Sequence, residues 1–182
     1  GIRDRAGDAS TLIAGDIWYN SSAKKIRGAK LVAAWASGTA MPANKWVGFG
    51  AGTQTSNVVA GGATTPPANG NQVNTTFEYD GSSWTAGGAI NTTRFDGAGF
   101  GASNTAAIIA SGGASPGSGR KTEVESYDGS TWTEVADVST GRERPSRAGN
   151  TNYALAGGGN TGSVTNATEE WTIGQNIKTI AD

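Results

Sequence analysis

The chain repeats a short motif three times, and this repetition constrains the fold more than any other feature. Each copy has a short apolar run followed by two glycines, and the pairs begin at Gly61, Gly112 and Gly157. The copies are therefore 51 and 45 residues apart. Repeats of about 20–50 residues form small structural units that cannot bury their apolar faces alone and stack on their neighbours.

A second motif follows the glycines in the same order. Tyr79 and Tyr127 each precede an Asp-Gly pair, and Trp84 and Trp132 follow five residues after the tyrosine. Asp-Gly between β-prone flanks is a hairpin signal, because glycine accepts the positive φ that such turns require. In the third copy Trp171 takes the tyrosine position, and both the Asp-Gly pair and the later tryptophan are missing.

These patterns predict an all-β chain in which each copy is an antiparallel sheet of about four strands. We expect helix in less than about a tenth of the residues. The apolar runs Val58-Val59, Ile108-Ile109 and Ala154-Leu155 should be equivalent inner strands, buried on both faces. The twelve expected strands lie near 47–50, 57–61, 74–79, 83–86, 96–99, 106–111, 122–127, 131–135, 147–150, 152–156, 167–172 and 176–180.

Composition excludes several classes of function. Charged residues make up 16% of the chain and the net charge is −1, so binding to nucleic acid through a basic surface is not expected. No apolar stretch is long enough to insert into a membrane. The chain has no Cys and no His, which removes thiolate nucleophiles, imidazole acid–base chemistry and most zinc sites. We therefore expect no enzyme activity, no catalytic or metal site and no cofactor.

The order Gly-Gly, Tyr, Trp resembles the kelch repeat over roughly residues 35–173. The resemblance implies that each copy is one four-stranded blade of a β-propeller. It also implies that the motif residues are scaffold, namely Gly61, Gly62, Gly112, Gly113, Gly157, Gly158, Tyr79, Tyr127, Trp84 and Trp132. Closed propellers usually have at least about four blades, whereas this chain has three copies.

A different segment precedes the repeats. Gly15-Asp16-Ile17-Trp18-Tyr19-Asn20 continues to Gly28 and Trp35 and resembles a segment common in phage tail fibres. Alternation before Ser21 and after Lys24 predicts a β-hairpin, and the 49-residue spacing from Trp35 to Trp84 predicts that Trp35 lies in a strand. The expected organisation is an N-terminal arm (1–14), a hairpin or partial blade (15–35) and three kelch-like repeats (36–86, 87–135 and 136–182).

The two resemblances together imply a structural component of a phage virion, such as a tail fibre or another surface-exposed part. Its loops would mediate virion assembly or host attachment, and its partners would be other virion proteins, copies of itself and a host-surface glycan. The alternatives are a carbohydrate-binding module of non-viral origin and a capsid decoration protein. An enzyme on a propeller is a further alternative, which the absence of His and Cys weakens.

Few residues carry chemistry, and for each the structural interpretation is the favoured one. Glu123 with Glu125, and Glu169 with Glu170, are carboxylate pairs of the kind that acid–base catalysts use, but solvated strand residues are expected. Asp80 and Asp128 are expected to form turns rather than to bind calcium. The charge cluster of Arg142, Glu143, Arg144 and Arg147 is expected to form ion pairs within a loop rather than to bind a phosphate or an acidic sugar. The Gly-x-Gly segments at 48–52 and 97–101 lack the features of a phosphate-binding loop. The aromatic candidates for stacking on sugars are Trp18, Tyr19, Trp46 and Phe100, most of which are expected to be packing residues.

Three sheets stacked on one another leave two faces uncovered, each with apolar surface. The hairpin of residues 15–35 would close a small ring, or neighbouring chains would cover the open faces. Subunit contacts are expected in either case.

Overall fold

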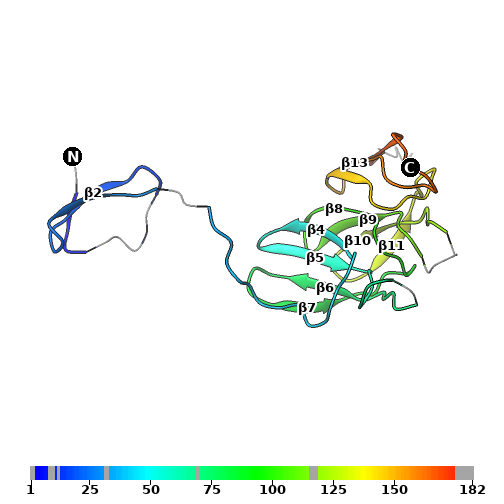
Figure 1. The fold of residues 1–182 in the computed structure, drawn as a ribbon, viewed down its shortest axis with the longest axis horizontal. Coiled ribbons are helices and arrows are strands. Elements are labelled where there is room, and N and C mark those ends of the chain that lie inside the picture. The colour runs from blue at the N-terminus through cyan, green and yellow to red at the C-terminus, as the bar shows by residue number, and fades with distance from the viewer. Residues whose placement is uncertain are drawn as a thin grey trace, which may run out of the picture. The chain divides into compact units, whose positions relative to one another are not determined.

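Short strands joined by turns and longer loops make up the fold, as the glycine-rich sequence predicts. The computed structural model describes residues 3–7, 11, 13–30, 33–68, 70–114 and 119–174, and these residues form strands and turns without helix. The chain divides into two units, residues 1–37 and 38–182, which Figure 1 draws as separate bodies. Each unit is described below by itself.

The first unit is a three-stranded sheet. Its strands are Arg3–Arg5 (β1), Ile17–Asn20 (β2) and Lys25–Gly28 (β3). The β2–β3 pair is the predicted antiparallel hairpin. β1, which comes from the segment expected to be an arm, pairs with β2 in parallel. Trp18 is buried in this unit, whereas Trp35 belongs to no strand and is wholly exposed, so the expectation of a Trp35 strand was wrong.

The second unit contains three antiparallel sheets, one for each sequence repeat. The first sheet has strands Phe49–Thr53 (β4), Ser56–Ala60 (β5), Thr76–Tyr79 (β6) and Trp84–Gly87 (β7). The second sheet has Ala98–Ser103 (β8), Ala106–Ala110 (β9), Val124–Tyr127 (β10) and Trp132–Val135 (β11). The third sheet has Ser146–Gly149 (β12), Tyr153–Gly157 (β13) and Thr168–Thr172 (β14). A fourth strand predicted at 176–180 lies outside the described residues.

The structure shifts the register of the glycine repeat by one residue in the second and third copies. The backbone amides of Gly61, Ser111 and Gly158 make the same hydrogen bond, to the carbonyl just before the third strand of their sheet. Their φ angles are also alike, at 57°, 60° and 68°. Ser111 adopts this conformation although it is not glycine, and its hydroxyl donates to the carbonyls of Lys121 and Arg142. The first glycine position of the repeat is therefore occupied by Gly61 in the first copy, Ser111 in the second and Gly158 in the third.

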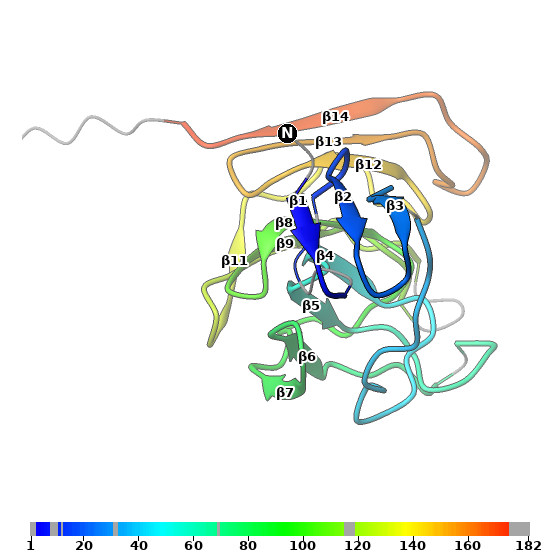
Figure 2. The same cartoon turned by 90° about the vertical axis from the view of Figure 1, so that its left-hand side faces the viewer.

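The second sheet is buried on both faces, because neighbouring residues of a strand point to opposite sides. Ile109 packs in a core with Phe49 and Val58 of the first sheet. Ile108 packs in another core with Ala154 and the third sheet. Figure 2 shows the stacking, with β12–β14 above β8 and β9, and β4–β7 below them.

The first strands of the sheets approach one another closely. A Cβ atom on Gly99 of β8 would lie 2.5 Å from the carbonyl oxygen of Gly50 in β4. No side chain fits in that space, so glycine is required where these two backbones meet. The Gly-x-Gly segments at 48–52 and 97–101 thus serve the packing of β4 against β8.

The third apolar run differs from the expectation. Val58, Ile108 and Leu155 are equivalent, because each is followed three residues later by the repeat position at 61, 111 or 158. Val58 and Ile108 are buried, but Leu155 is 40% exposed. Val59, expected to be buried on the other face of the first sheet, is only partly buried, because no other sheet among the described residues packs on that face. The prediction that Leu155 is buried was wrong, because this face of each sheet packs on the following sheet and the third sheet has none among the described residues.

Truncating Ile109 should therefore destabilise the protein far more than truncating Leu155. Ile109→Ala removes side-chain atoms from a closed core, and we expect it to lower the free energy of unfolding by about 2–5 kcal/mol. Leu155→Ala is the matched control and should cost less than about 0.5 kcal/mol if the open face has no partner. Urea unfolding of dilute protein measures both free energies. Equal losses of stability would contradict the difference between the covered face of the second sheet, where Ile109 lies, and the open face of the third, where Leu155 lies.

Candidate interaction surface

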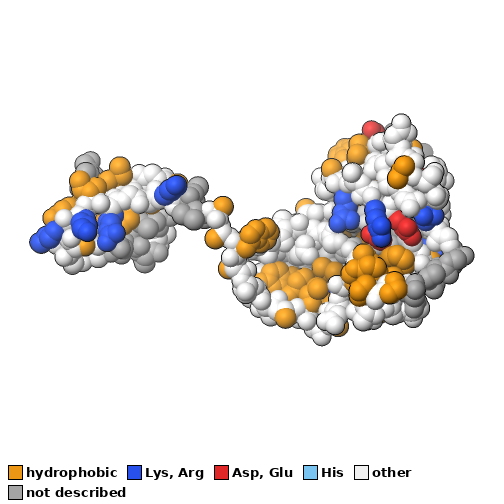
Figure 3. Space-filling model, viewed as in Figure 1, with side chains coloured by type: hydrophobic (Ala, Val, Ile, Leu, Met, Phe, Trp, Pro, Cys, Tyr) orange, Lys and Arg blue, Asp and Glu red, His pale blue; other side chains and the backbone are white. Residues whose placement is uncertain are grey.

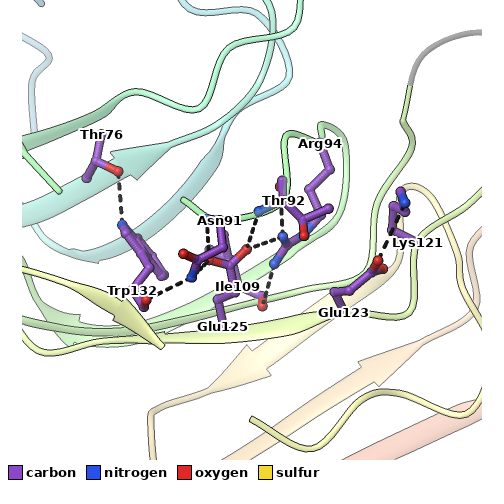
Figure 4. Close-up of polar contacts among 9 residues, drawn as sticks. All are labelled: Thr76, Asn91, Thr92, Arg94, Ile109, Lys121, Glu123, Glu125 and Trp132. Atoms are coloured by element: carbon purple, nitrogen blue, oxygen red, sulfur yellow. Dashed lines mark hydrogen bonds and ion pairs between the residues drawn. The ribbon is translucent and has the colours of Figure 1, made fainter. Parts of the chain in front are cut away.

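A buried ion pair lies inside the second sheet (Figure 4). Arg94 and Glu125 are both fully buried, and the Arg94 guanidinium pairs with the Glu125 carboxylate. Glu125 also accepts hydrogen bonds from the backbone and side-chain amides of Asn91, at 2.7 and 2.9 Å, and from the Thr92 amide at 3.2 Å. The Arg94 side chain donates further bonds to the carbonyls of Thr92 and Ile109. The pair thus ties the segment before β8 to β10.

The expectation that Glu123 and Glu125 are solvated strand residues was wrong for Glu125. The two carboxylates also have different surroundings, because Glu123 lies before β10, is partly exposed and pairs with Lys121 at 3.5 Å. Figure 4 shows Glu123 turned toward Lys121, away from the Arg94–Glu125 pair. With its oxygens occupied and no exposed surface, Glu125 is a counter-ion within the framework rather than half of an acid–base pair.

The same arrangement recurs in the third sheet. Arg142, which is 48 residues after Arg94, is buried and binds Glu169 at 2.5 Å. The backbone amide of Ser139 donates to Glu169 at 2.6 Å, as that of Asn91 does to Glu125. Glu170 is the next residue on β14 and points to the opposite, exposed face. Glu169 and Glu170 therefore do not share a site.

The first sheet fills the same positions with different side chains. Lys45 stands where Arg94 and Arg142 stand, and Phe77 stands where Glu125 and Glu169 stand. The Lys45 ammonium lies 5.3 Å from the centre of the Phe77 ring and donates to the carbonyls of Gly61 and Thr75. Burial lowers the pKa of Lys45 to about 8. A cation at this position is thus common to all three sheets.

The charge cluster 142–147 forms ion pairs, as predicted, but its members bind residues outside the cluster. Glu143 pairs with Arg120 at 3.6 Å, and Arg144 pairs with Asp96 at 2.5 Å. The Arg147 guanidinium donates to the Gly97 carbonyl at 2.9 Å. Figure 3 shows acidic and basic side chains side by side across the larger unit. These charges are engaged with one another, which leaves little free positive charge for a phosphate group.

Asp80 and Asp128 form turns, as predicted. Each carboxylate accepts the backbone amides of the second and third residues that follow it, Ser82 and Ser83 in one turn and Ser130 and Thr131 in the other. These hydrogen bonds hold the pKa of both aspartates well below the usual range. In the part of the chain that the structure describes, no group of three or more acidic, His or Cys residues is placed to hold a metal ion.

The aromatic candidates for sugar stacking serve mainly as packing. Trp18 and Phe100 are buried, and Tyr19 and Trp46 are partly buried. Tyr153, which is 65% exposed on β13, is not among these aromatic candidates. Its exposure was not predictable, because the adjacent run Ala154-Leu155 has the pattern of an inner strand.

Side-chain hydrogen bonds of the second repeat's motif Tyr and Trp join the first and second sheets. The Trp132 indole donates to the Thr76 hydroxyl at 3.0 Å, and the Tyr127 hydroxyl donates to the Glu78 carboxylate. The Tyr127 and Trp132 rings are stacked, with 4.6 Å between their centres. Burial, together with the Glu78 carboxylate, raises the pKa of Tyr127 to about 12. Tyr127 and Trp132 thus hold the second sheet against the first.

The remaining surface of interest is the outer face of the third sheet. Its central residues Ala148, Leu155 and Glu170 lie side by side across β12, β13 and β14. With Tyr153 and Thr172 they line a shallow groove. Figure 3 shows hydrophobic side chains exposed at the top of the larger unit, where Figure 1 draws β13. A smaller apolar pocket of about 70 Å³ between the second and third sheets lies well below the size of an ordinary ligand site.

Comparisons with known proteins establish the fold. Neither sequence profiles of protein families nor the curated proteins give a match. The solved structure of YjhT, a β-propeller-like kelch fold, matches with a TM-score of 0.63 and 16% sequence identity. The match covers 91% of this chain and 51% of that one, so the chain spans about half the length of YjhT. The chain is therefore an all-β protein with kelch-like propeller blades.

Among the described residues there is no helix with the length and apolar character that crossing a membrane requires.

Neutralising the buried carboxylate should destabilise the second sheet. Glu125→Gln leaves the Arg94 charge buried without its counter-ion, and we expect a loss of about 3–5 kcal/mol in the free energy of unfolding. Glu123→Gln changes the same chemical group two residues away, where it is partly exposed, and should cost less than about 1 kcal/mol. Chemical denaturation of the two variants is the measurement. Similar losses in both would contradict the framework function assigned to Glu125.

Proposed function

We propose that the chain is a structural component of a phage virion, in a tail fibre or another surface-exposed part. Its kelch-like blades form a rigid support, and its loops mediate virion assembly or host attachment. The observation that best supports a non-catalytic function is the use of the buried charges. Arg94, Glu125, Arg142 and Glu169 are all engaged within the sheets, which makes them framework rather than reactive groups.

The surfaces proposed for recognition are loops whose two ends join strands of the sheets. The connections between the second and third strands span 61–75, 111–123 and 158–167, and they are rich in Gly, Asn, Ser and Thr. Amide and hydroxyl groups on a rigid support suit hydrogen bonding to a glycan or to another protein surface. The proposed partners are other virion proteins, copies of this chain and a host-surface glycan.

A carbohydrate-binding module of non-viral origin is the second candidate. It is favoured by Tyr153 and Trp35, whose rings are exposed in the described structure and suit stacking on a sugar face. The two candidates differ in location, because a virion protein is a fixed part of a particle whereas a carbohydrate-binding module works on its own. A capsid decoration protein would also be part of a particle, but on its head.

Immunogold electron microscopy separates these possibilities. Antibodies raised against the purified chain should label phage particles from the source material, and we expect gold at the tail or its fibres. Gold over the head would favour a capsid decoration protein. Unlabelled particles, together with strong binding of the free chain on a glycan array, would contradict the virion proposal and favour the carbohydrate-binding module. Tyr153→Ser is the variant that should then reduce glycan binding.

A further inference from the structure

The third sheet presents a face that the first two sheets use for packing on a following sheet. In the first sheet the equivalent face is closed, with Phe49, Val58 and Thr76 each 1% exposed. In the third sheet the equivalent residues Ser146, Leu155 and Thr168 are all exposed. The face of the first sheet that packs on the second sheet therefore has an uncovered equivalent in the third sheet.

The polar residues of this face match those of the first sheet rather than those of the second. Thr168 and Glu170 stand at the positions of Thr76 and Glu78, as the pairing of β13 with β14 and of β5 with β6 shows. Thr76 and Glu78 accept hydrogen bonds from the Trp132 indole and the Tyr127 hydroxyl. The side chains of Thr168 and Glu170 have no hydrogen-bond or ion-pair partner among the described residues.

The second sheet has a different pair at these positions. Val124 and Ser126 lie there, and the third sheet that packs on them has Trp171 in place of the tyrosine and lacks the tryptophan that follows it in the first two repeats. The sheet that carries Thr and Glu at these positions, the first, is thus followed by a sheet that carries both the motif Tyr and the motif Trp. The open face of the third sheet is suited to a blade of that kind.

The first sheet is such a blade, and its Tyr–Trp face points away from the second sheet. Tyr79 and Trp84 pack with 4.9 Å between their ring centres, as Tyr127 and Trp132 do at 4.6 Å. Both Tyr79 and Trp84 are partly exposed, and the Tyr79 hydroxyl has no hydrogen-bond partner among the described residues. Figure 3 shows hydrophobic side chains gathered over the part of the larger unit where Figure 1 draws the first sheet.

We infer that the open face of the third sheet docks the first sheet of a second copy of this chain. In this contact the Tyr79 hydroxyl of one copy donates to Glu170 of the other. The Trp84 indole, which donates to the Thr39 carbonyl at 3.0 Å in the single chain, changes partner to the Thr168 hydroxyl. The contact would form whether or not the chain belongs to a virion.

Two copies make this contact twice, because each has one face of each kind. A head-to-tail contact that closes after two copies gives a ring with two-fold symmetry, in which the Tyr–Trp face of each first sheet and the open face of each third sheet are covered. The ring contains six blades, within the range of about four to eight found in closed propellers.

Sedimentation equilibrium of the full 182-residue chain at micromolar concentrations is the first test. We expect a species of twice 18.3 kDa that dissociates on dilution. Leu155→Arg places a charge at the centre of the docking face and should give a folded species of 18.3 kDa. Val164→Arg is the matched control, because Val164 is 89% exposed and lies on a loop of the same repeat outside the sheet face.

Cross-linking tests which faces meet. The chain contains no cysteine, so Ser82→Cys and Thr172→Cys each introduce a single exposed thiol, one near the Tyr–Trp face and one beside Glu170. A short bismaleimide should link the two variants when they are mixed and should link neither variant to itself. Circular dichroism confirms that each variant is folded.

Three results would overturn the inference. The first is a wild-type chain that remains a monomer at all soluble concentrations, which is the result expected if the hairpin of residues 15–35 closes the ring. The second is efficient linking of Thr172→Cys to itself, because the third sheets would then face each other. The third is an open series of species larger than two copies, because the contact would then not close.

Discussion

Face-to-face packing between successive sheets is the interaction on which the rest of the structure depends. Ile108 and Ile109 are neighbours in β9, yet they enter two different cores because a strand presents alternate residues to opposite sides. Each core is made by two sheets and by neither alone. A repeat of this kind gains most of its stability from the units next to it, and the outer face of the third sheet has no such unit among the described residues.

The buried ion pairs have a different function within this packing. A buried pair adds little net stability compared with apolar side chains, but removing one partner is costly. The first sheet has no ion pair at this position, since Lys45 and Phe77 stand where Arg94 and Glu125 stand in the second. What all three sheets share is a cation bound to backbone carbonyls. We interpret the cation as fixing the segment that links one sheet to the next.

Sequence reasoning found the repeated sheets, the Asp80 and Asp128 turns and the hairpin of residues 17–28, because each has a local signal in glycine, Asp-Gly or alternation. It missed features that depend on what lies across the sheet. Leu155 has the sequence neighbours of a buried residue, but no sheet covers it among the described residues. Glu125 has the sequence neighbours of a solvated strand residue, but it faces Arg94, which is 31 residues earlier in the chain. The glycine register failed for a related reason, because the hydroxyl of Ser111 binds two carbonyls and holds a conformation expected of glycine.

Hydrogen exchange measured by mass spectrometry tests the central claim most directly, namely that coverage by neighbouring sheets determines stability. The amides of β9 and β10 should exchange slowest at every protein concentration, because both faces of the second sheet are covered within one chain. Those of β13 and β14 should exchange faster in dilute protein and slow down as the concentration rises and the open face is covered. Protection of β13 and β14 equal to that of β9 and β10 at every concentration would contradict the account.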